Sequence, residues 1–346
     1  MTTMAEVAEE AGVGVATVSR VLNGSPSVRD ETRDRVLAAI KRLGYVPNIA
    51  ARALSTGRTG TIGVIAPFLT RPSVVERLRG VSRVLAPTDY LLILYDVERP
   101  EQRGEFFRTL AGGGRLDGLL CISLCPTGEE LAPLAAAGVP AVVVDHSHDK
   151  LPSVSTDDVE GGRLATEHLI SLGHERIAFV GDDEHDGYGF TSSARRRTGW
   201  SRALGAAELP AGRDLVRTTA HGRETAAAAA RELLKGGDPP TAVFAASDIQ
   251  GLGVLEAAEA CGVAVPDDLS VVGFDDIELA RWAGLTTVAQ PLEESGACGA
   301  ELLLAALEGA PARGRRLELE LVRRTTTGPA GNMRGRSSRM TTTTVQ

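Results

Sequence analysis

Apolar residues recur at helical spacing in three short stretches of the first 47 residues. The first two stretches are separated by the turn 11–14 (AGVG), in which Gly12 can adopt the positive φ that a sharp exit from a helix requires. The third stretch covers residues 30–43. Thr3 and Glu6 are spaced as a capping box, which predicts that the first helix begins after Thr3. The side chains expected to face inward are those of Val7, Ala8, Ala11, Val18, Val21, Leu22, Val36, Leu37, Ile40 and Leu43.

From residue 61 the pattern changes to apolar runs of strand length that alternate with helical stretches. Such repeated units predict parallel sheets covered by helices on both faces. The runs form two sets, so the expected fold class is α/β: an all-α head, then a two-lobed body of doubly wound parallel sheets with a cleft between the lobes. Strands are expected at 61–67, 90–97, 116–123, 140–146, 176–182, 241–248 and 269–276, and helices near 73–86, 100–112, 128–137, 160–172, 193–206, 222–236, 250–262 and 292–308.

These patterns also set the expected boundaries. The sequence predicts a head over 1–47, a linker over 48–60, a body over 61–328 and a tail over 329–346. One lobe should hold residues 61–158 and 291–325, and the other 159–290, because segment 285–308 is expected to cross back. Residues 316–324 alternate in hydropathy, which predicts one late strand with a wet face, and the Gly-, Ser-, Thr- and Arg-rich tail predicts disorder.

The outward face of the second helix is short and polar. Arg20 can present two parallel donors to guanine, while hydroxyl and amide groups suit phosphate oxygens. Two short helices joined by a tight turn are typical of a DNA-binding helix-turn-helix. The pattern alone also fits an ordinary three-helix domain with solvated hydroxyls. The outward side chains are Val15, Ala16, Thr17, Ser19, Arg20 and Asn23.

Charge is distributed unevenly along the chain. The whole chain carries a formal net charge of −8, but residues 1–60 contain eight Lys and Arg against six Asp and Glu, a net charge of +2. The remaining 29 basic and 39 acidic residues give −10. The positive field is therefore confined to the head, and the acidic body discourages indiscriminate wrapping of DNA.

The four cysteines are Cys121, Cys125, Cys261 and Cys298. Cys121 and Cys125 lie in an apolar run without a second pair or a nearby His at zinc-ligand spacing, which favours buried thiols in a reducing compartment. The sequence has no basic-then-apolar leader and no apolar run of membrane length. We therefore expect a cytoplasmic protein.

No motif for nucleotide, zinc-protease or serine-hydrolase chemistry is present (GxxxxGK[ST], HExxH, GxSxG). The loop 181–190 approaches a calcium-binding loop, but its closing bidentate position falls on Ser193, which cannot serve. We therefore predict no metal, no cofactor and no enzymatic activity.

Polar residues recur where predicted strands end. Asp145 and His146 follow one strand, Asp248 another, and Asp275 and Asp276 a third. Each alone could cap a helix or carry surface charge. Because the carboxyl ends of parallel strands meet at one edge of a sheet, their recurrence predicts a ligand-binding cleft.

The stretches AGVGVATVSRVLNG and VRDETRDRVLAAIKRLGYVPNIAARAL together resemble the head of the lactose-repressor (LacI/GalR) family of bacterial transcriptional regulators. Gly14 departs from the family pattern, which usually has a serine cap there, and the small apolar pair at 15–16 can touch thymine methyls but cannot donate to bases. The resemblance implies base contacts for Val15, Ala16 and Arg20, and phosphate contacts for Thr17, Ser19, Asn23, Thr32, Tyr45 and Asn48.

Residues 48–57 (NIAARALSTG) form a helix-prone segment too short to be stable alone, and its composition also fits a flexible tether. The resemblance implies a hinge that becomes helical on DNA. Leu54 would wedge into the central base step of the operator, with Ala51 packed beside it, and the inserted side chain would bend the duplex. Folding on binding makes such a hinge the natural place to couple a distant ligand to DNA affinity.

The body segments IGVIAP, HLISLGHERIAFVGD, ARRRTGW and TAVFAASDIQGLGVLEAAEACGVAVPDDLSVVGFDD are similar to the ligand-binding core of the same family. Residues 71–74 (RPSV) replace an Asn-Pro-aromatic-aromatic run found in many members, which argues against a flat heteroaromatic ligand. A sugar or oligosaccharide is expected instead. By position, the ligand-contacting residues are Asp145, Arg196, Asp248, Asp275, Trp282 and Gln290.

The resemblance implies a ligand-responsive regulator, usually a repressor, that binds a palindromic operator as a homodimer. Whether the ligand releases DNA or promotes binding is left open. Two other classes are considered, an exported-type solute-binding protein and a nucleotide-dependent oxidoreductase. The DNA-binding head and missing leader argue against the first, and the lack of a strand-borne GxGxxG argues against the second.

Overall fold

The computed structural model describes residues 2–22, 24–45, 58–112, 116–183 and 187–331. The chain forms two compact units, Met1–Gly60 and Thr61–Gln346. Among the described helices, none is both long and apolar enough to cross a membrane.

The described residues of the first unit form three helices: α1 (Met4–Ala11), α2 (Val15–Leu22) and α3 (Asp30–Leu43). The predicted capping box is confirmed, because the Glu6 amide donates to Thr3 Oγ1 and the Thr3 amide to Glu6 Oε2. Gly12 takes the left-handed conformation, with φ 64°. Leu37 was expected inside but is 49% exposed. It lies about 100° around the helix from Val36 and so leaves the buried stripe, in which Ala39 takes part instead.

The part of the second unit that the structure describes forms two six-stranded sheets. The first sheet has the order β11-β5-β4-β3-β1-β2 and is parallel throughout. The second has the order β12-β10-β9-β8-β6-β7, in which β12 alone is antiparallel to its neighbour. The strands are β1 (Thr61–Ala66), β2 (Leu91–Asp96), β3 (Gly118–Ile122), β4 (Ala141–Val144), β5 (Ser153–Ser155), β6 (Ile177–Asp182), β7 (Val216–Thr219), β8 (Ala242–Ala245), β9 (Ser270–Asp275), β10 (Thr286–Ala289), β11 (Arg315–Arg316) and β12 (Glu320–Val322).

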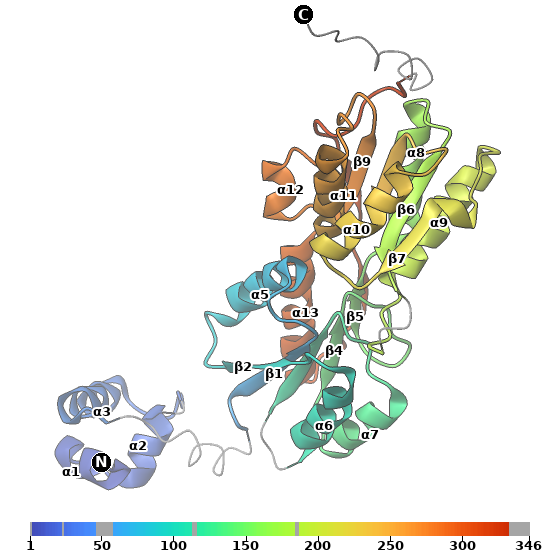
Figure 1. The fold of residues 1–346 in the computed structure, drawn as a ribbon. Helices are drawn as coiled ribbons and strands as arrows, with labels where there is room; N and C mark the ends of the chain where they lie inside the picture. The colour runs from blue at the N-terminus through green and yellow to red at the C-terminus, as the bar shows by residue number, and fades with distance from the viewer. Residues whose placement is uncertain (1, 23, 46–57, 113–115, 184–186, 332–346) are drawn as a thin grey trace, which may run out of the picture. The chain divides into compact units, whose positions relative to one another are not determined.

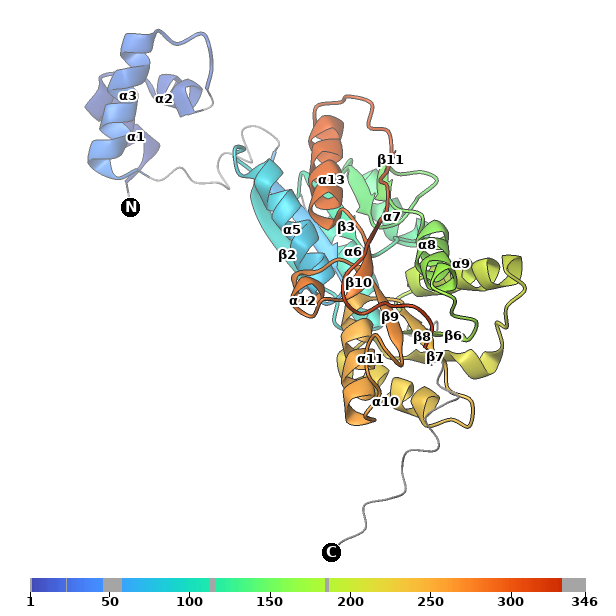
Figure 2. The same cartoon turned by 90° about the horizontal axis from the view of Figure 1, so that it is seen from above.

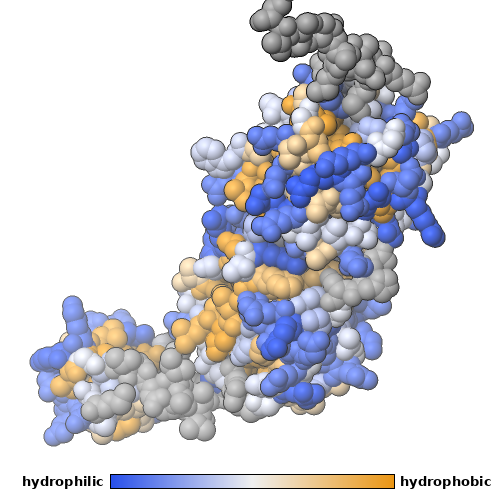
Figure 3. Space-filling model, viewed as in Figure 1, coloured by the Kyte–Doolittle hydropathy of each residue, from blue (hydrophilic) through white to orange (hydrophobic). Residues whose placement is uncertain are grey.

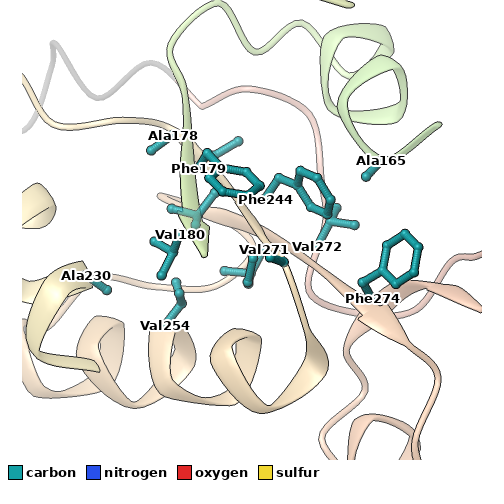
Figure 4. Packing of buried hydrophobic residues seen from close by; sticks show 14 of the residues in the cluster. Ala165, Ala178, Phe179, Val180, Ala230, Phe244, Val254, Val271, Val272 and Phe274 are labelled. Carbon is teal, nitrogen blue, oxygen red and sulfur yellow. The ribbon is translucent and has the colours of Figure 1, made fainter. Parts of the chain in front are cut away.

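Helices cover both faces of each sheet, as the alternating pattern predicts (Figures 1 and 2). The first sheet packs against α5 (Pro72–Leu85) and α13 (Leu292–Leu307) on one face, and against α6 (Pro100–Ala111) and α7 (Gly128–Ala136) on the other. The second sheet lies between α8 (Asp158–Ser171) with α9 (Ser192–Ala206) and α10 (Arg223–Leu234) with α11 (Asp248–Ala260). Figure 4 shows Val254 of α11 and Ala230 of α10 on the same side as Val180 and Val271, while the rings of Phe179 and Phe244 lie on the other side, toward Ala165 of α8. The short helices are α12 (Glu278–Trp282) and a 3-10 turn at Arg213–Leu215.

Three helix pairs approach so closely that only glycine fits at the contact. A Cβ on Gly80 of α5 would lie 1.9 Å from the carbonyl oxygen of Glu293 in α13, and one on Gly296 of α13 would lie 1.9 Å from that of Arg77. The pairs α8–α9 and α10–α11 are locked in the same way, at Gly162 and Gly253. Because each overlap is with backbone, no side-chain rotation can relieve it.

The late part of the chain differs from the prediction. Residues 316–324 do not form one strand: β11 joins the edge of the first sheet and β12 the edge of the second, because the chain crosses between the lobes after residue 317. Lobe one therefore does not extend to residue 325. Strands β5, β7 and β10 and helix α12 were not predicted. The tail expected from 329 begins as ordered chain, since the Ala330 amide donates to the Leu172 carbonyl at 2.9 Å, and residues 332–346 lie outside the described part.

All four cysteines are free thiols. Cys121 and Cys298 are buried, as expected, whereas Cys125 and Cys261 are half-buried. Burial raises the pKa of the Cys121 thiol far above its ordinary value, so it stays protonated and inert.

Candidate functional site

The carboxyl ends of several strands from both sheets meet around a small, mostly polar cavity of about 60 Å³, which we call the inner compartment. It brings together four of the six predicted ligand residues. Asp145 follows β4, Asp275 ends β9, Gln290 follows β10, and Arg196 comes from α9. The lining is Pro67, Arg71, Ser73, Val74, Arg77, Ser123, Asp145, His146, Asp182, Phe190, Ser192, Arg196, His221, Ser247, Asp275 and Gln290.

Arg196 is buried and fully engaged. Its Nε donates to Asp158 Oδ1 at 2.8 Å and its Nη1 to the Ala246 carbonyl at 2.6 Å, while its guanidinium carbon lies 3.6 Å from the centre of the Phe274 ring. The close contact of α9 with Gly162 of α8 fixes the backbone from which it projects. Burial opposes its charge, but the neighbouring carboxylates outweigh burial and raise its pKa.

The charged forms of Asp158 and Asp275, the two carboxylates beside Arg196, are disfavoured by their surroundings. Burial raises the pKa of Asp158 and of Asp275, and the nearby guanidinium only partly offsets this. Gln290 Nε2 donates to Asp275 Oδ1 at 2.6 Å, which stabilises the ionised form. The inner compartment therefore contains desolvated, hydrogen-bonded charges, which suit the recognition of polar ligand groups.

Arg77 is the central side chain of this compartment and was not among the predicted site residues. It is 2% exposed on α5, and its Nη2 lies 2.5 Å from Asp145 Oδ1 and 3.4 Å from Gln290 Oε1. Its Nε has no hydrogen-bond partner among the residues that the structure describes. The available signal was its position: Arg77 falls three residues after Val74 and four before Val81, within the apolar stripe of its helix.

Backbone strain gathers at the same edge of the sheets. Ser123, Asp145 and Asp275 have φ of 52°, 81° and 118°, in the region that favours glycine. Phe68, just beyond β1, has φ 52°. Non-glycine residues hold such conformations where the surrounding structure over-determines them, which is frequent at binding sites.

The other two predicted ligand residues lie elsewhere. Asp248 is fully buried at the start of α11, where Oδ1 accepts from Thr287 Oγ1 at 2.6 Å and Oδ2 from the Ile277 amide at 2.9 Å. Burial raises its pKa well above the ordinary value. Trp282, the last residue of α12, is 83% exposed. Neither lines the inner compartment.

A second, larger cavity of about 460 Å³ adjoins the first and shares Arg71, Asp182 and His221 with it. We call it the outer compartment. Its wall is mostly apolar, and it is formed by Phe68, Thr70, Arg71, Pro72, Asp182, Asp183, Tyr188, Thr219, Ala220, His221, Gly222 and Ile249.

The predicted DNA-contacting residues of the first unit are arranged as follows. Val15, Ala16 and Arg20 are exposed on α2. Thr17, Ser19 and Thr32 are half-buried, and Tyr45 is buried at the end of the helical core. Gly14 offers only its carbonyl, which accepts from the amides of Thr17 and Val18. Asn23, Asn48, Ala51 and Leu54 lie outside the described residues, as does the hinge segment.

Among the described residues, no group of His, Cys, Asp and Glu could hold a metal ion. In the loop that resembles a calcium site, Asp182 Oδ1 forms hydrogen bonds with His221 Nδ1 at 2.9 Å and with Gln250 Nε2 at 2.8 Å. Ser193 Oγ accepts from the Asp182 amide at 2.8 Å and thus serves the loop itself.

A helical head with an exposed second helix, joined to a two-lobed body with a polar cleft, defines the class of ligand-regulated transcription factors. Two family models support this: the one described as bacterial regulatory proteins, lacI family, matches residues 3–48, and the one described as a periplasmic binding protein-like domain matches residues 166–327. The chain belongs to the lacI family of bacterial regulatory proteins.

Known relatives are similar over nearly the whole chain. Catabolite control protein A of Priestia megaterium is 34% identical over 305 residues, 87% of this chain and 91% of its own. The HTH-type transcriptional regulator CelR of Thermobifida fusca is 36% identical over 329 residues, 92% and 95% of the two chains. These relatives are regulators and not enzymes, so the expectation of a non-enzyme is confirmed by kinship.

Two solved structures share the fold. The lac repressor dimer bound to operator and the anti-inducer ONPF has a TM-score of 0.83 at 30% identity, covering 94% of this chain and 99% of that one. The transcriptional regulator CelR–cellobiose complex has a TM-score of 0.69 at 34% identity, covering 94% and 100%.

Proposed function

We propose that this protein is a bacterial transcriptional repressor that binds a palindromic operator as a homodimer and is controlled by a sugar or oligosaccharide in the cleft of its body. The observation that carries the proposal is the inner compartment, where Arg196, Asp275 and Gln290 converge in a chain that also bears a helix-turn-helix head. Its place of work is then the cytoplasm, where the operator lies.

The sequence-reading residues are proposed on α2. Val15, Ala16 and Arg20 are exposed and suited to base edges. Thr17, Ser19, Thr32 and Tyr45 are proposed to meet phosphates, together with Asn23 and Asn48. Because the apolar pair at 15–16 cannot donate, base specificity depends on Arg20 and on DNA shape. A Leu54 wedge with Ala51 beside it remains a proposal from family position.

A second copy is proposed to cover β2. This strand ends the order of the first sheet, so one side of its backbone has no neighbour among the described strands. Leu91, Ile93 and Leu94 are 51%, 40% and 45% exposed on it, and Figure 3 shows apolar surface over β2 and the adjoining α5. An exposed apolar edge strand favours pairing with another chain. Ile93→Lys is expected to convert a dimer to a monomer in sedimentation equilibrium.

Arg20→Ala tests the DNA function. Loss of a bidentate guanine contact is expected to cost about 1–3 kcal/mol in operator affinity and to relax base preference at one position of each half-site. Gel shifts with operator and with scrambled duplex measure both. Arg108→Ala on α6, which changes net charge equally but lies in the body, should leave both unchanged. Unaltered base preference in Arg20→Ala would remove Arg20 as a reader.

Asp275→Asn tests ligand control. It keeps the side-chain shape but removes the charge that Arg196 and Gln290 face. Operator binding should survive while the response to ligand is lost. A full ligand response in this variant would move the ligand out of the cleft.

A further inference from the structure

We infer that residues 187–190, on the loop between β6 and α9, form a latch that holds the two lobes of the body together in a closed arrangement. The latch belongs to the second lobe, but it inserts Tyr188 and Phe190 into the apolar cluster of the first lobe. The inference goes beyond the proposed function, because it depends on neither the ligand nor the operator.

Two aromatic rings form the apolar part of the latch. Tyr188 and Phe190 stack on each other with their centres 5.3 Å apart and an angle of 7° between them. Tyr188 is 8% exposed and its ring centre lies 5.1 Å from that of Phe68 in the first lobe. The guanidinium of Arg71, also in the first lobe, lies 4.1 Å from the centre of the Phe68 ring and 5.6 Å from that of Phe190. Separation of the lobes would return both latch rings to water and break these contacts.

Arg103 holds the backbone of the latch against the first lobe. Its Nη1 donates to the Tyr188 carbonyl at 3.0 Å, and its Nη2 donates to the Cys125 carbonyl. Glu130 orients the guanidinium, with 2.6 Å between Arg103 Nε and Glu130 Oε1. The Tyr188 hydroxyl in turn donates to the Glu98 carbonyl. Hydrogen bonds from a charged donor are stronger than neutral ones, so the latch joins the lobes by polar as well as apolar contacts.

The latch lies far from the segments in which the chain crosses between the lobes. These crossings follow β5, β10 and β11. In the second sheet β6 lies three strands from β10, and at about 4.8 Å per strand the latch begins roughly 14 Å from that crossing. A contact beside the crossings, such as that of Thr156 with Gln290, changes little when the lobes rotate about them. The latch, by contrast, must break before the lobes can open.

Two glycines flank Tyr188 in the latch. Gly187 and Gly189 have φ of 80° and 76°, in the region that favours glycine. Their surroundings differ, because an added Cβ on Gly187 would lie 3.0 Å from Pro100 Cγ at the start of α6, whereas one on Gly189 would meet nothing within 4 Å. Gly187 therefore marks a close approach of the two lobes, and Gly189 offers a control with similar backbone strain.

Every partner in these contacts belongs to the chain itself. The latch therefore closes the lobes without the help of any other molecule, and it makes the closed arrangement the resting state of the body. Opening is then the step that costs free energy, and a substitution that weakens the latch should shift the population toward the open arrangement.

Two native thiols report on the latch in the full chain. Cys125 is half-buried beside Arg103, and burial raises the pKa of its thiol. Cys261 is half-buried at the end of α11 in the second lobe and serves as the internal control. Tyr188→Ala should speed alkylation of Cys125 by N-ethylmaleimide about tenfold and leave that of Cys261 unchanged, as followed by peptide mass spectrometry. Tyr90→Ala is the matched control, because Tyr90 packs in the cluster on the opposite face of the first sheet.

A distance between the lobes distinguishes their opening from movement of the loop alone. Spin labels at Arg108→Cys on α6 and Arg202→Cys on α9 report one exposed position in each lobe. Cys125→Ser and Cys261→Ser confine the labels to these positions, and dilution with unlabelled protein removes distances between copies. Double electron–electron resonance should show one short distance in this background and an added longer one with Tyr188→Ala. A faster Cys125 with an unchanged distance distribution would mean that the loop moves alone, and would overturn the inference.

The glycine pair keeps the test valid if Tyr188→Ala does not fold. Gly187→Ala retains both aromatic rings but places a methyl group against Pro100, and it should also add the longer distance. Gly189→Ala carries similar backbone strain without that contact, and it should keep the wild-type distribution. The same change in Gly189→Ala or in Tyr90→Ala, or no change in Gly187→Ala, would contradict a latch. These measurements use neither operator nor ligand, so they are independent of the gel shifts that test the proposed function.

Discussion

The contact between α5 and α13 makes a quantitative prediction about Gly80 and Gly296. An added Cβ at either position falls 1.9 Å from a carbonyl oxygen, about 1.5 Å short of the 3.4 Å at which ordinary contact begins. Either alanine must therefore push the helices apart. Overpacking of a well-packed core costs about 1–3 kcal/mol, and a clash with rigid backbone belongs at the upper end. Since alanine also favours the helix by about 1 kcal/mol, the expected net loss is about 2 kcal/mol for each variant.

The double variant sharpens the test. One separation of the helices relieves both clashes, so Gly80→Ala with Gly296→Ala should cost about 3 kcal/mol, less than the sum of the two. Urea unfolding followed by far-UV circular dichroism measures the free energies of unfolding. The slope m of free energy against urea concentration should stay unchanged if the substitutions alter stability alone. Gly104→Ala in α6 is the control, because its Cβ would meet nothing within 4 Å and should stabilise by about 0.5–1 kcal/mol. The reasoning is refuted if Gly80→Ala behaves like Gly104→Ala, or if the two clashes add in full.

Three other predictions follow from single contacts. Arg77→Leu leaves the half-buried Asp145 charge without its ion-pair partner and should lower the free energy of unfolding by about 3 kcal/mol in urea titrations. Adding Asp145→Asn should restore part of this loss. An unchanged free energy of unfolding in Arg77→Leu would contradict a stabilising ion pair. Thr3→Ala removes the acceptor of the capping box and should cost the head about 1 kcal/mol in calorimetry, whereas an unchanged head transition would mean that water replaces the cap. Burial lowers the pKa of His174 and of His168, so their protons bind preferentially to the unfolded chain. Stability should therefore fall as pH drops below about 6.5, and His174→Asn should flatten this slope in thermal melts at pH 5–7; an identical slope would exclude His174 as its source.

Local chemistry made the helical head predictable. The capping box of Thr3 and the positive φ of Gly12 depend on residues within one turn of each other, so the sequence displays them directly. The two-sheet body followed from the same kind of information, since strands buried on both faces read as continuous apolar runs.

Features that depend on distant partners were less accessible. Asp248 was chosen because it follows a strand, but its oxygens turn to Thr287 and Ile277, which only the fold brings near. Tyr188 inserts into the lobe opposite to that of its own strand, and no local pattern encodes this. Arg77 could have been predicted, because a charged residue within an apolar helical stripe indicates a buried partner of opposite charge.

The three passages of the chain between its two lobes have a consequence for biosynthesis. The first sheet receives its outermost strand, β11, about 160 residues after β5 has been made. Synthesis proceeds at about 5–20 residues per second, so roughly 8–30 s pass between the synthesis of β5 and that of β11. During most of this time the first sheet lacks α13, which will cover part of one of its faces. The newborn protein therefore exposes an unfinished apolar surface for a period in which a chaperone that holds nascent chains has ample time to bind.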